Sequence, residues 1–370
     1  MEVDQEVLDF LLEERAAGRP VSNGDLQDKA REVAVGLPNM EDFKASDGWV
    51  RRWKKRNWVG IRRGTNEAQK IPQDYADRVH EFQHQIFQLR GQHNYTMYNI
   101  GNMDQTMCRF DMAPKSTNNI RGEADVRIAA TGGAKKGFTV ALTALANGEK
   151  KPAYIVLKER NGIIPGRVFA NLRLPGNVRV TASPNGWMTG DKMTDWIQRV
   201  WGDNRDDVRR LVVLDMARIH TMQATQDTLT ERDTDVVYVP GGCTPICQPA
   251  DVSWNAPFKS EMRKAWKEWR QEDHRTAQGN LRMATRQDII NWVSRAWRSV
   301  SADVIRDSFK HCGISSNMNG SEDHLLNDRM ADALNAHDRN QEAVRGEAPG
   351  IIFDSDESSD DDFEGFSDED

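Results

Sequence analysis

The sequence predicts an α/β protein in which a mixed β-sheet is flanked by helices, with a small all-α domain before it and a disordered acidic tail after it. Three observations favour this fold class. Residues 1–70 carry short amphipathic helical patterns, residues 97–240 combine apolar strand patterns with helical ones, and residues 354–370 hold ten acidic and no basic side chains. The expected segments are the all-α domain 1–68, a helical connector 69–95, the α/β domain 96–275, a helical extension 276–313 and a mostly disordered region 314–370.

The first three helical patterns place a basic helix last. They cover residues 2–18, 22–35 and 46–58, and the third contains Trp49 and Trp53 four positions apart. These aromatic side chains anchor the helix to a small core, which leaves its cations facing outward. Three short helices with a basic third one are the layout of a helix-turn-helix domain, so the sequence predicts double-stranded DNA as a partner. The candidate DNA-binding residues are Arg51, Arg52, Lys54, Lys55 and Arg56, together with Arg62 and Arg63.

Charge is distributed unevenly along the 370 residues. The formal net charge of −7 becomes +3 without the acidic tail, while residues 51–70 alone carry +7. Charge blocks of this kind mark interaction surfaces or disordered arms, and the plainer alternative is a solvated helix face. No apolar run is long enough for a membrane span, and the first residues do not form a secretory signal. Four cysteines in this length fit a reducing compartment rather than a disulfide framework.

Residues 71–95 form a polar amphipathic helical pattern that we interpret as a connector. This segment contains His80, His84 and His93, and the first two stand one helical turn apart. No acidic or cysteine partner completes a recognisable set of metal ligands, so a solvated or capping role is favoured over a metal site.

The α/β region opens with strand patterns joined by turns and continues with strands separated by helices. Asn147-Gly148 is a strong hairpin signal, and the stretches "RRLVVLDMA" and "DVVYVP" have the continuous apolar character of strands buried on both faces. The pattern predicts strands at 97–106, 125–133, 137–146, 150–158, 209–217 and 235–240, and helices at 189–201, 221–233, 253–271, 285–300 and 301–314.

Three aspartates stand at positions where a sheet collects ligands. Asp104 is expected at the end of the first strand, Asp215 ends an apolar strand, and Asp251 begins a helix. A charge at the end of a buried strand is costly unless it is paired or binds a cation, and ligands bind at the ends of central strands in α/β sheets. Mg²⁺ would relieve the repulsion among three carboxylates. For each aspartate a helix-capping or surface role stays open, and Asp111 competes with Asp104, although a continued strand would point it to the opposite face.

The loop "PGGCTPICQPADVSW" raises a second metal hypothesis, because Cys243 and Cys247 lie four residues apart. A zinc site needs two further ligands, and neither Cys108, Cys312 nor the histidines stand at a recognisable spacing. We therefore favour a role for the two loop cysteines as small packing residues. The loop is expected to be stiff and to hold Asp251 beside the other two aspartates. Its stiffness is expected from Gly241, Gly242, Pro245 and Pro249.

These motifs and their spacing resemble a known family. Asp104 and Asp215 are 111 residues apart, and Asp215 and Asp251 are 36 apart. With "NMDQT", "LVVLDMARIH", "VPGGCTPICQPADVSWNAPFKSEMRKAW" and the N-terminal "FKASDGWVRRWKKRN", the chain resembles the pogo/Tigger group of DDE transposases within the Tc1/mariner superfamily, which also includes centromere protein B. The resemblance covers most of residues 1–330.

The resemblance implies a ribonuclease H-like fold in which three acidic residues bind two Mg²⁺ or Mn²⁺ ions. Asp104, Asp215 and Asp251 match that catalytic and metal-binding set by position. It further implies that the protein cuts and joins DNA strands by two-metal phosphodiester chemistry, in the nucleus and as a homodimer. Arg218 and His220 stand where relatives often carry basic residues that contact phosphate or orient the metal ligands. For His220, a capping or packing role is equally open.

A different function stays open beside the enzymatic one. Relatives usually carry another helix-turn-helix unit before the one seen here, so a fragment or a domesticated gene is also expected, with half of the DNA-end recognition surface absent. In that case the chain is a nuclear DNA-binding, chromatin or transcriptional regulator with an inactive catalytic core. The acidic tail would then recruit chromatin or other basic protein partners.

Overall fold

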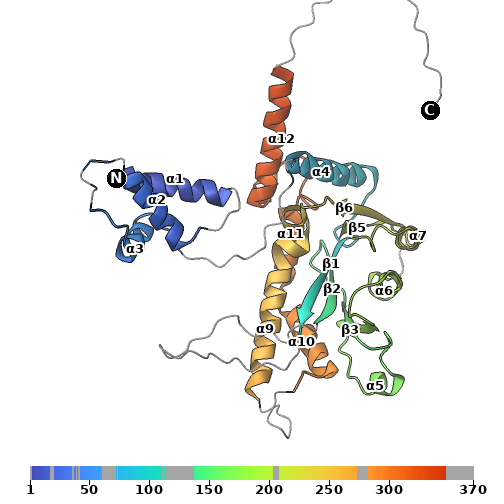
Figure 1. The fold of residues 1–370 in the computed structure, drawn as a ribbon. Helices are drawn as coiled ribbons and strands as arrows, with labels where there is room; N and C mark the ends of the chain where they lie inside the picture. Colours follow the sequence, from blue (N-terminus) through green and yellow to red (C-terminus); the bar gives the residue numbers. More distant parts are fainter. Residues whose placement is uncertain are drawn as a thin grey trace, which may run out of the picture. The chain divides into compact units, whose positions relative to one another are not determined.

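The computed structural model describes residues 2–16, 21–35, 37–38, 40, 42–60, 72, 74–110, 112, 137–202, 208–272 and 282–346. The chain divides into two compact units, Met1–Ile71 and Pro72–Asp370 (Figure 1). The predicted strand at 125–133, the competing Asp111, the candidate DNA-binding residues Arg62 and Arg63, and the acidic tail all lie outside the described residues.

The first unit is a bundle of three helices, as predicted. The helices are α1 (Glu2–Ala16), α2 (Asn23–Val35) and α3 (Asp47–Arg56). Trp53 is fully buried among apolar residues of α1 and α2, and its indole N–H donates to the carbonyl of Asp4 at 3.0 Å. The Ser46 hydroxyl accepts from the backbone N–H of Trp49 and caps α3, which fixes where the basic helix begins.

The second unit is built on a six-stranded mixed sheet with the order β4-β3-β2-β1-β5-β6. β1, β2 and β3 are antiparallel neighbours, whereas β4 pairs parallel with β3, and β5 and β6 extend the sheet in parallel from β1. β4 was not predicted, although Val178, Val180 and Ala182 alternate with more polar residues in the pattern of a strand. The strands are β1 (Ile100–Arg109), β2 (Gly137–Leu145), β3 (Ala153–Lys158), β4 (Val178–Ser183), β5 (Arg210–Asp215) and β6 (Thr234–Val239).

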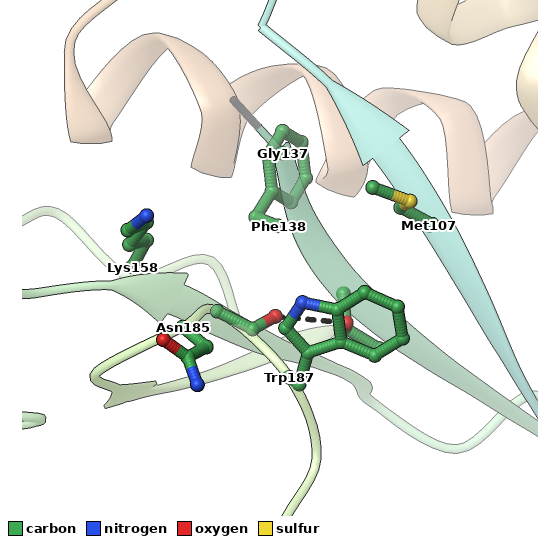
Figure 2. Close-up of a pocket in the computed structure, with 8 residues that line it drawn as sticks. Met107, Gly137, Phe138, Lys158, Asn185 and Trp187 are labelled. Atoms are coloured by element: carbon green, nitrogen blue, oxygen red, sulfur yellow. Dashed lines mark hydrogen bonds between the residues drawn. The ribbon is translucent and has the colours of Figure 1, made fainter. Parts of the chain in front are cut away.

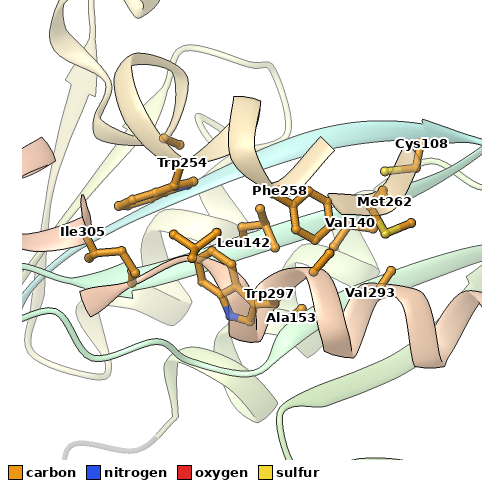
Figure 3. Packing of buried hydrophobic residues seen from close by; sticks show 14 of the residues in the cluster. Cys108, Val140, Leu142, Ala153, Trp254, Phe258, Met262, Val293, Trp297 and Ile305 are labelled. Carbon is orange, nitrogen blue, oxygen red and sulfur yellow. The ribbon is translucent and has the colours of Figure 1, made fainter. Parts of the chain in front are cut away.

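Helices cover both faces of this sheet, and the two faces bury separate apolar clusters. The larger cluster joins one face to α9 and α10 through large side chains such as Phe258, Met262 and Trp297 (Figure 3). The helices on this side are α4 (Tyr75–Gln92), α9 (Asn255–Gln271), α10 (Arg286–Ser299), α11 (Ala302–His311) and α12 (Asp328–Gly346). The helices on the other face are α6 (Gly190–Trp196), η1 (Ile197–Trp201) and α7 (Gln223–Thr230). The short α5 (Gly166–Ala170) follows β3.

The C-terminal region differs from the sequence prediction. The expectation of disorder from residue 314 onward is wrong for residues 314–346, because a short 3₁₀ turn, η3 (Asp323–Leu325), leads into α12, and Met330 and Ala333 are fully buried against the large core. The segments predicted as a connector and as a helical extension also belong to this core, since α4, α10 and α11 bury apolar residues in it. Within the described residues, no helix is both long and apolar enough to cross a membrane.

Candidate active site

Two of the predicted aspartates lie on adjacent parallel strands. The register of β1 with β5 pairs Ile100 with Leu211 and Asn102 with Val213, an offset of 111 residues that also separates Asp104 from Asp215. Asp215 ends β5, as predicted. The expectation that Asp104 ends its strand is wrong, because β1 continues to Arg109 alongside β2. Asp104 is therefore level with the end of β5, and both aspartates are on the sheet face that carries Ile100 and Leu211.

Asp251 reaches the same face from a helical segment. It is the second residue of η2 (Ala250–Trp254), a π-helical turn that runs directly into α9. The predicted loop before it contains the short α8 (Thr244–Cys247), and Gly242 has a φ of 82°, a conformation that favours glycine. Asp251 is not a helix cap, since Pro249 precedes η2 and Trp254 precedes α9.

One amide joins two of the three carboxylates. The Nδ2 of Asn255, the first residue of α9, donates to Oδ2 of Asp104 at 2.6 Å and to Oδ1 of Asp251 at 3.0 Å. Asp104 and Asn255 are buried, with 7% and 6% of their surface exposed, while Asp251 is exposed toward solvent. The two acids therefore converge on a single nitrogen atom.

The proximity of these acids raises two of their pKa values. Burial, and then the negative charge of Asp251, raises the pKa of Asp104 to about 6, with a smaller contribution from Asp215 and against the hydrogen bond from Asn255. Although Asp251 is exposed as a residue, partial loss of water around its carboxylate raises its pKa as well, with the charge of Asp215 adding to the shift and Asn255 and Lys259 opposing it. All three carboxylates therefore lie within electrostatic reach of one another.

Asp215 has the opposite electrostatic balance. Burial alone would raise its pKa, but the hydrogen bond and the charge of His220 outweigh burial and lower the pKa. His220 is 1% exposed, and its Nδ1 lies 2.5 Å from Oδ1 of Asp215. Its Nε2 lies 2.8 Å from the Nε2 of Gln105. His220 thus orients Asp215, whereas Arg218 is exposed beside it.

Sequence reasoning missed two asparagines that hold the site together. Asn102 is fully buried; its Nδ2 donates to the carbonyl of Val213 at 2.8 Å, and its Oδ1 accepts from the backbone N–H of Ala250 at 3.2 Å. It thereby ties β1 to β5 and to the start of η2. Asn255 could have been found, because it stands four residues after Asp251 in a helical pattern and therefore on the same helix face. No local signal marks Asn102.

The residues present fit an oxygen-bound divalent cation. Among the described residues, no three His, Cys, Asp or Glu side chains lie close enough to form a ready metal cage. Two carboxylates nevertheless converge on one amide nitrogen, a third lies beside them, and every candidate donor is oxygen, the ligand type that Mg²⁺ and Mn²⁺ prefer. Cys243 and Cys247 are fully buried, and burial raises the pKa of both thiols, as expected of packing residues.

The basic helix α3 offers fewer free cations than the sequence indicates. Arg56 forms a two-pronged ion pair with Asp4, with donor–acceptor distances of 2.8 and 2.9 Å, and Lys54 donates to Asn23. These two cations brace the helical unit. Arg51, Arg52 and Lys55 are exposed, and no hydrogen bond or ion pair engages them within the described part of the chain. Their guanidinium and ammonium groups are therefore available for a phosphate-bearing partner.

Figure 2 shows a pocket of about 230 Å³. It is bordered by Met107 of β1, Lys158 at the end of β3, and the turn that carries Asn185 and Trp187. Met107 differs in strand parity from Asp104, so the two side chains are on opposite faces of the sheet. None of the predicted site residues borders this pocket.

The mixed-sheet unit with its acidic residues and the basic three-helix unit each match a known protein family. Residues 135–309 match the DDE superfamily endonuclease family, and residues 1–65 match the Tc5 transposase DNA-binding domain. The chain is a pogo-like member of the DDE transposase group, as the sequence predicts. The human "Pogo transposable element with KRAB domain" is 31% identical over 330 residues, which cover 87% of this chain and 53% of that protein.

A further relative and a solved structure are also similar to this chain. The "CENP-B homolog protein 2" of Schizosaccharomyces pombe is 22% identical over 80% of this chain and 57% of its own length. The chain spans about half the length of the curated relatives it matches. The "Mos1 transposase paired-end complex with left transposon end" matches with a TM-score of 0.51 and 14% identity, covering 90% of this chain and 78% of that one, which shows a shared fold.

Proposed function

We propose that the protein is a transposon-derived, divalent-metal-dependent nuclease that cuts and joins strands of double-stranded DNA. This proposal is supported by the shared hydrogen bonds of Asp104 and Asp251 to the Asn255 amide, and by the position of Asp215 on the same sheet face as Asp104. Solved Mos1 mariner paired-end complexes, which share the fold, include one with Mn and one with Mg, and this supports the choice of metal. We further propose a nuclear location and a homodimer, as the family resemblance implies.

The acidic side chains would hold the metal ions, and their neighbours would set their geometry. Two Mg²⁺ or Mn²⁺ ions would activate a water molecule and neutralise charge that develops on the scissile phosphate. Asp104 and Asp251 present oxygens that converge at the Asn255 amide, and Asp215 is kept ionised by His220. With a pKa of about 6, Asp104 is mostly ionised at neutral pH and available as a ligand. Arg218 would contact a DNA phosphate next to Asp215.

The N-terminal unit would supply most of the DNA affinity. Arg51, Arg52 and Lys55 project from α3 without intramolecular partners in the described residues, and each phosphate contact they make would release a counterion. Arg56 and Lys54 would contribute indirectly, since they fix the orientation of α3 against α1 and α2.

A cleavage assay tests the proposed chemistry. Purified protein should nick supercoiled DNA carrying the terminal repeats of its own element when Mg²⁺ or Mn²⁺ is present, and EDTA should stop the reaction. Asp215→Asn should abolish nicking while leaving DNA binding intact, because the N-terminal unit is unchanged. Asp227→Asn, on the exposed surface of α7, is the matched control and should nick normally. Folded, DNA-bound wild-type protein that never nicks under any metal condition would refute the enzymatic proposal.

A second candidate function is supported by the carboxylate geometry itself. Within the described residues the acids do not form a ready metal cage, and an amide already links two of them. A domesticated chromatin or transcriptional regulator would retain this arrangement of acids and bind DNA through α3, with the acidic tail contacting basic partners. Such a protein would give a gel shift that depends on Arg51 and Arg52 but no metal-dependent nicking.

A further inference from the structure

The amide of Asn255 is only half satisfied. Its Nδ2 donates two hydrogen bonds, but its Oδ1 is buried and has no hydrogen-bond partner within the described residues. A buried carbonyl oxygen without a partner costs about 1–3 kcal/mol. The side chain is 6% exposed and aimed at two carboxylates, so this oxygen lies at the edge of the acidic cluster and not in an unrelated part of the core.

The nitrogen of this amide occupies the place where a cation is expected. Asp104 and Asp251 are both acids that converge on one nitrogen atom, and the partly positive NH₂ group between them reduces the repulsion of their carboxylates. A divalent cation that contacts both carboxylates would compete with the NH₂ group for the same oxygens. The amide must therefore respond when a cation binds.

We propose that Asn255 is a ligand of the divalent cation, and that its amide turns to present Oδ1 in place of Nδ2 when the cation binds. This inference rests on the metal-dependent function proposed above. The terminal torsion of asparagine is broad and roughly two-fold, so the exchange of oxygen and nitrogen needs no backbone movement. Asparagine carbonyl oxygens are ordinary ligands of hard divalent cations. In the metal-free protein the same side chain holds the carboxylates together.

A neutral amide ligand suits the charge of this site. The three aspartates already supply negative charge, and a fourth carboxylate would increase their repulsion in the metal-free state. The first residue of α9 is also held firmly, because Trp254 before it and Phe258 after it are fully buried in the large core. The ligand position is therefore fixed by packing, while only the terminal amide is free to turn.

Manganese binding to the full chain tests the inference without using catalysis. Free Mn²⁺ is measured by electron paramagnetic resonance in titrations of wild type, Asn255→Ala, Asn255→Asp and Asp104→Asn. We expect Asn255→Ala to weaken Mn²⁺ binding at least about tenfold. Asn255→Asp keeps the shape and a ligating oxygen, and should bind Mn²⁺ at least as tightly as wild type. Asn177→Ala, which loses hydrogen bonds to Ser294 in another part of the same unit, should leave binding unchanged.

The outcomes separate the two proposals. Equal or tighter Mn²⁺ binding by folded Asn255→Ala overturns the ligand role, because it means that the amide only substitutes for the cation. Wild type that binds no more Mn²⁺ than Asp104→Asn instead overturns the proposed metal-dependent function. If Asn255→Ala fails to fold, the Asn255→Asp variant provides the test. In EDTA it should unfold at a lower temperature than wild type, and Mn²⁺ should raise its unfolding temperature by more than it raises that of wild type. A rise no larger than that of wild type contradicts the inference.

Discussion

Replacing Asp104 with asparagine should make the metal-free protein more stable at neutral pH. Asp104 is 7% exposed, and burial followed by the charge of Asp251 raises its pKa from 3.8 to about 6. The asparagine keeps the shape of the side chain and an oxygen that can accept the hydrogen bond from Asn255. It removes the charge, and with it the cost of holding an ionised carboxylate in this site.

The magnitude follows from the pKa shift. A rise from 3.8 to about 6 corresponds to about 3 kcal/mol of destabilisation once the carboxyl is ionised in both folded and unfolded states. Because the folded-state pKa is raised, the cost is absent below about pH 4, grows as pH rises between about 4 and 6, and is complete above that window. Sharing of the charge with Asp251 reduces the expected gain for Asp104→Asn to about 1–3 kcal/mol at pH 7.5.

Calorimetric unfolding in EDTA at pH 4, 5.5 and 7.5 measures this gain. A unit of this size should show an increase in melting temperature of about 2–4 °C per kcal/mol. Asp235→Asn is the matched control with the opposite sign, because hydrogen bonds from Arg209 and Tyr95 lower the pKa of Asp235 against the effect of burial. That variant should lose stability at pH 7.5. A gain for Asp104→Asn that is absent at pH 7.5, or equally large at pH 4, would refute the electrostatic reasoning.

Further expected outcomes concern the DNA-binding unit and the residues that position the acids. In DNA-binding titrations, the Arg51→Ala/Arg52→Ala double variant should lower the slope of log affinity against log salt by about two. Arg56→Ala should leave that slope nearly unchanged. It should cost less than about 1 kcal/mol of stability, because the ion pair of Arg56 with Asp4 is half exposed. Asn102→Ala should cost about 3 kcal/mol in urea unfolding, because it leaves two buried backbone groups without partners. His220→Ala should raise the pKa of Asp215. Because the pKa of Asp215 is lowered in the folded protein, its interaction with His220 stabilises the fold above the unfolded-state pKa, and this stabilisation is lost as pH falls. Acid unfolding of the variant, followed by circular dichroism, should therefore begin at a higher pH than that of wild type.

The sequence was sufficient to predict elements with strong, local patterns. The apolar runs of β5 and β6, the amphipathic α9 and α10, and the basic α3 are all where periodicity places them. Asp215 could be placed at a strand end because a charge closes an apolar run. The offset of 111 residues between Asp104 and Asp215 equals the offset between paired residues of β1 and β5. This register could not be predicted from the sequence of either strand alone.

Other features depend on contacts between distant segments. Disorder was expected after residue 314 because the composition is polar, yet Met330, Ala333 and Leu334 stand at helical spacing and bury one side of α12 against the core. Asn102 lies within a strand pattern, and its role appears only when β5 and η2 are brought beside it. Arg56 is a basic residue on the basic helix and was therefore predicted to contact DNA, but it forms an ion pair with Asp4, fifty-two positions earlier in the chain.

The three aspartates by themselves do not decide between an enzyme and a DNA-binding protein of the same ancestry. Asp104 and Asp215 are placed by the register of β1 against β5. Asp251 is placed by Asn102, which fixes the start of η2, and by Asn255, which draws its carboxylate toward Asp104. A substitution at either asparagine would therefore misplace the third carboxylate while all three aspartates remain in the sequence. Both asparagines are present here, and their hydrogen bonds hold Asp251 next to Asp104.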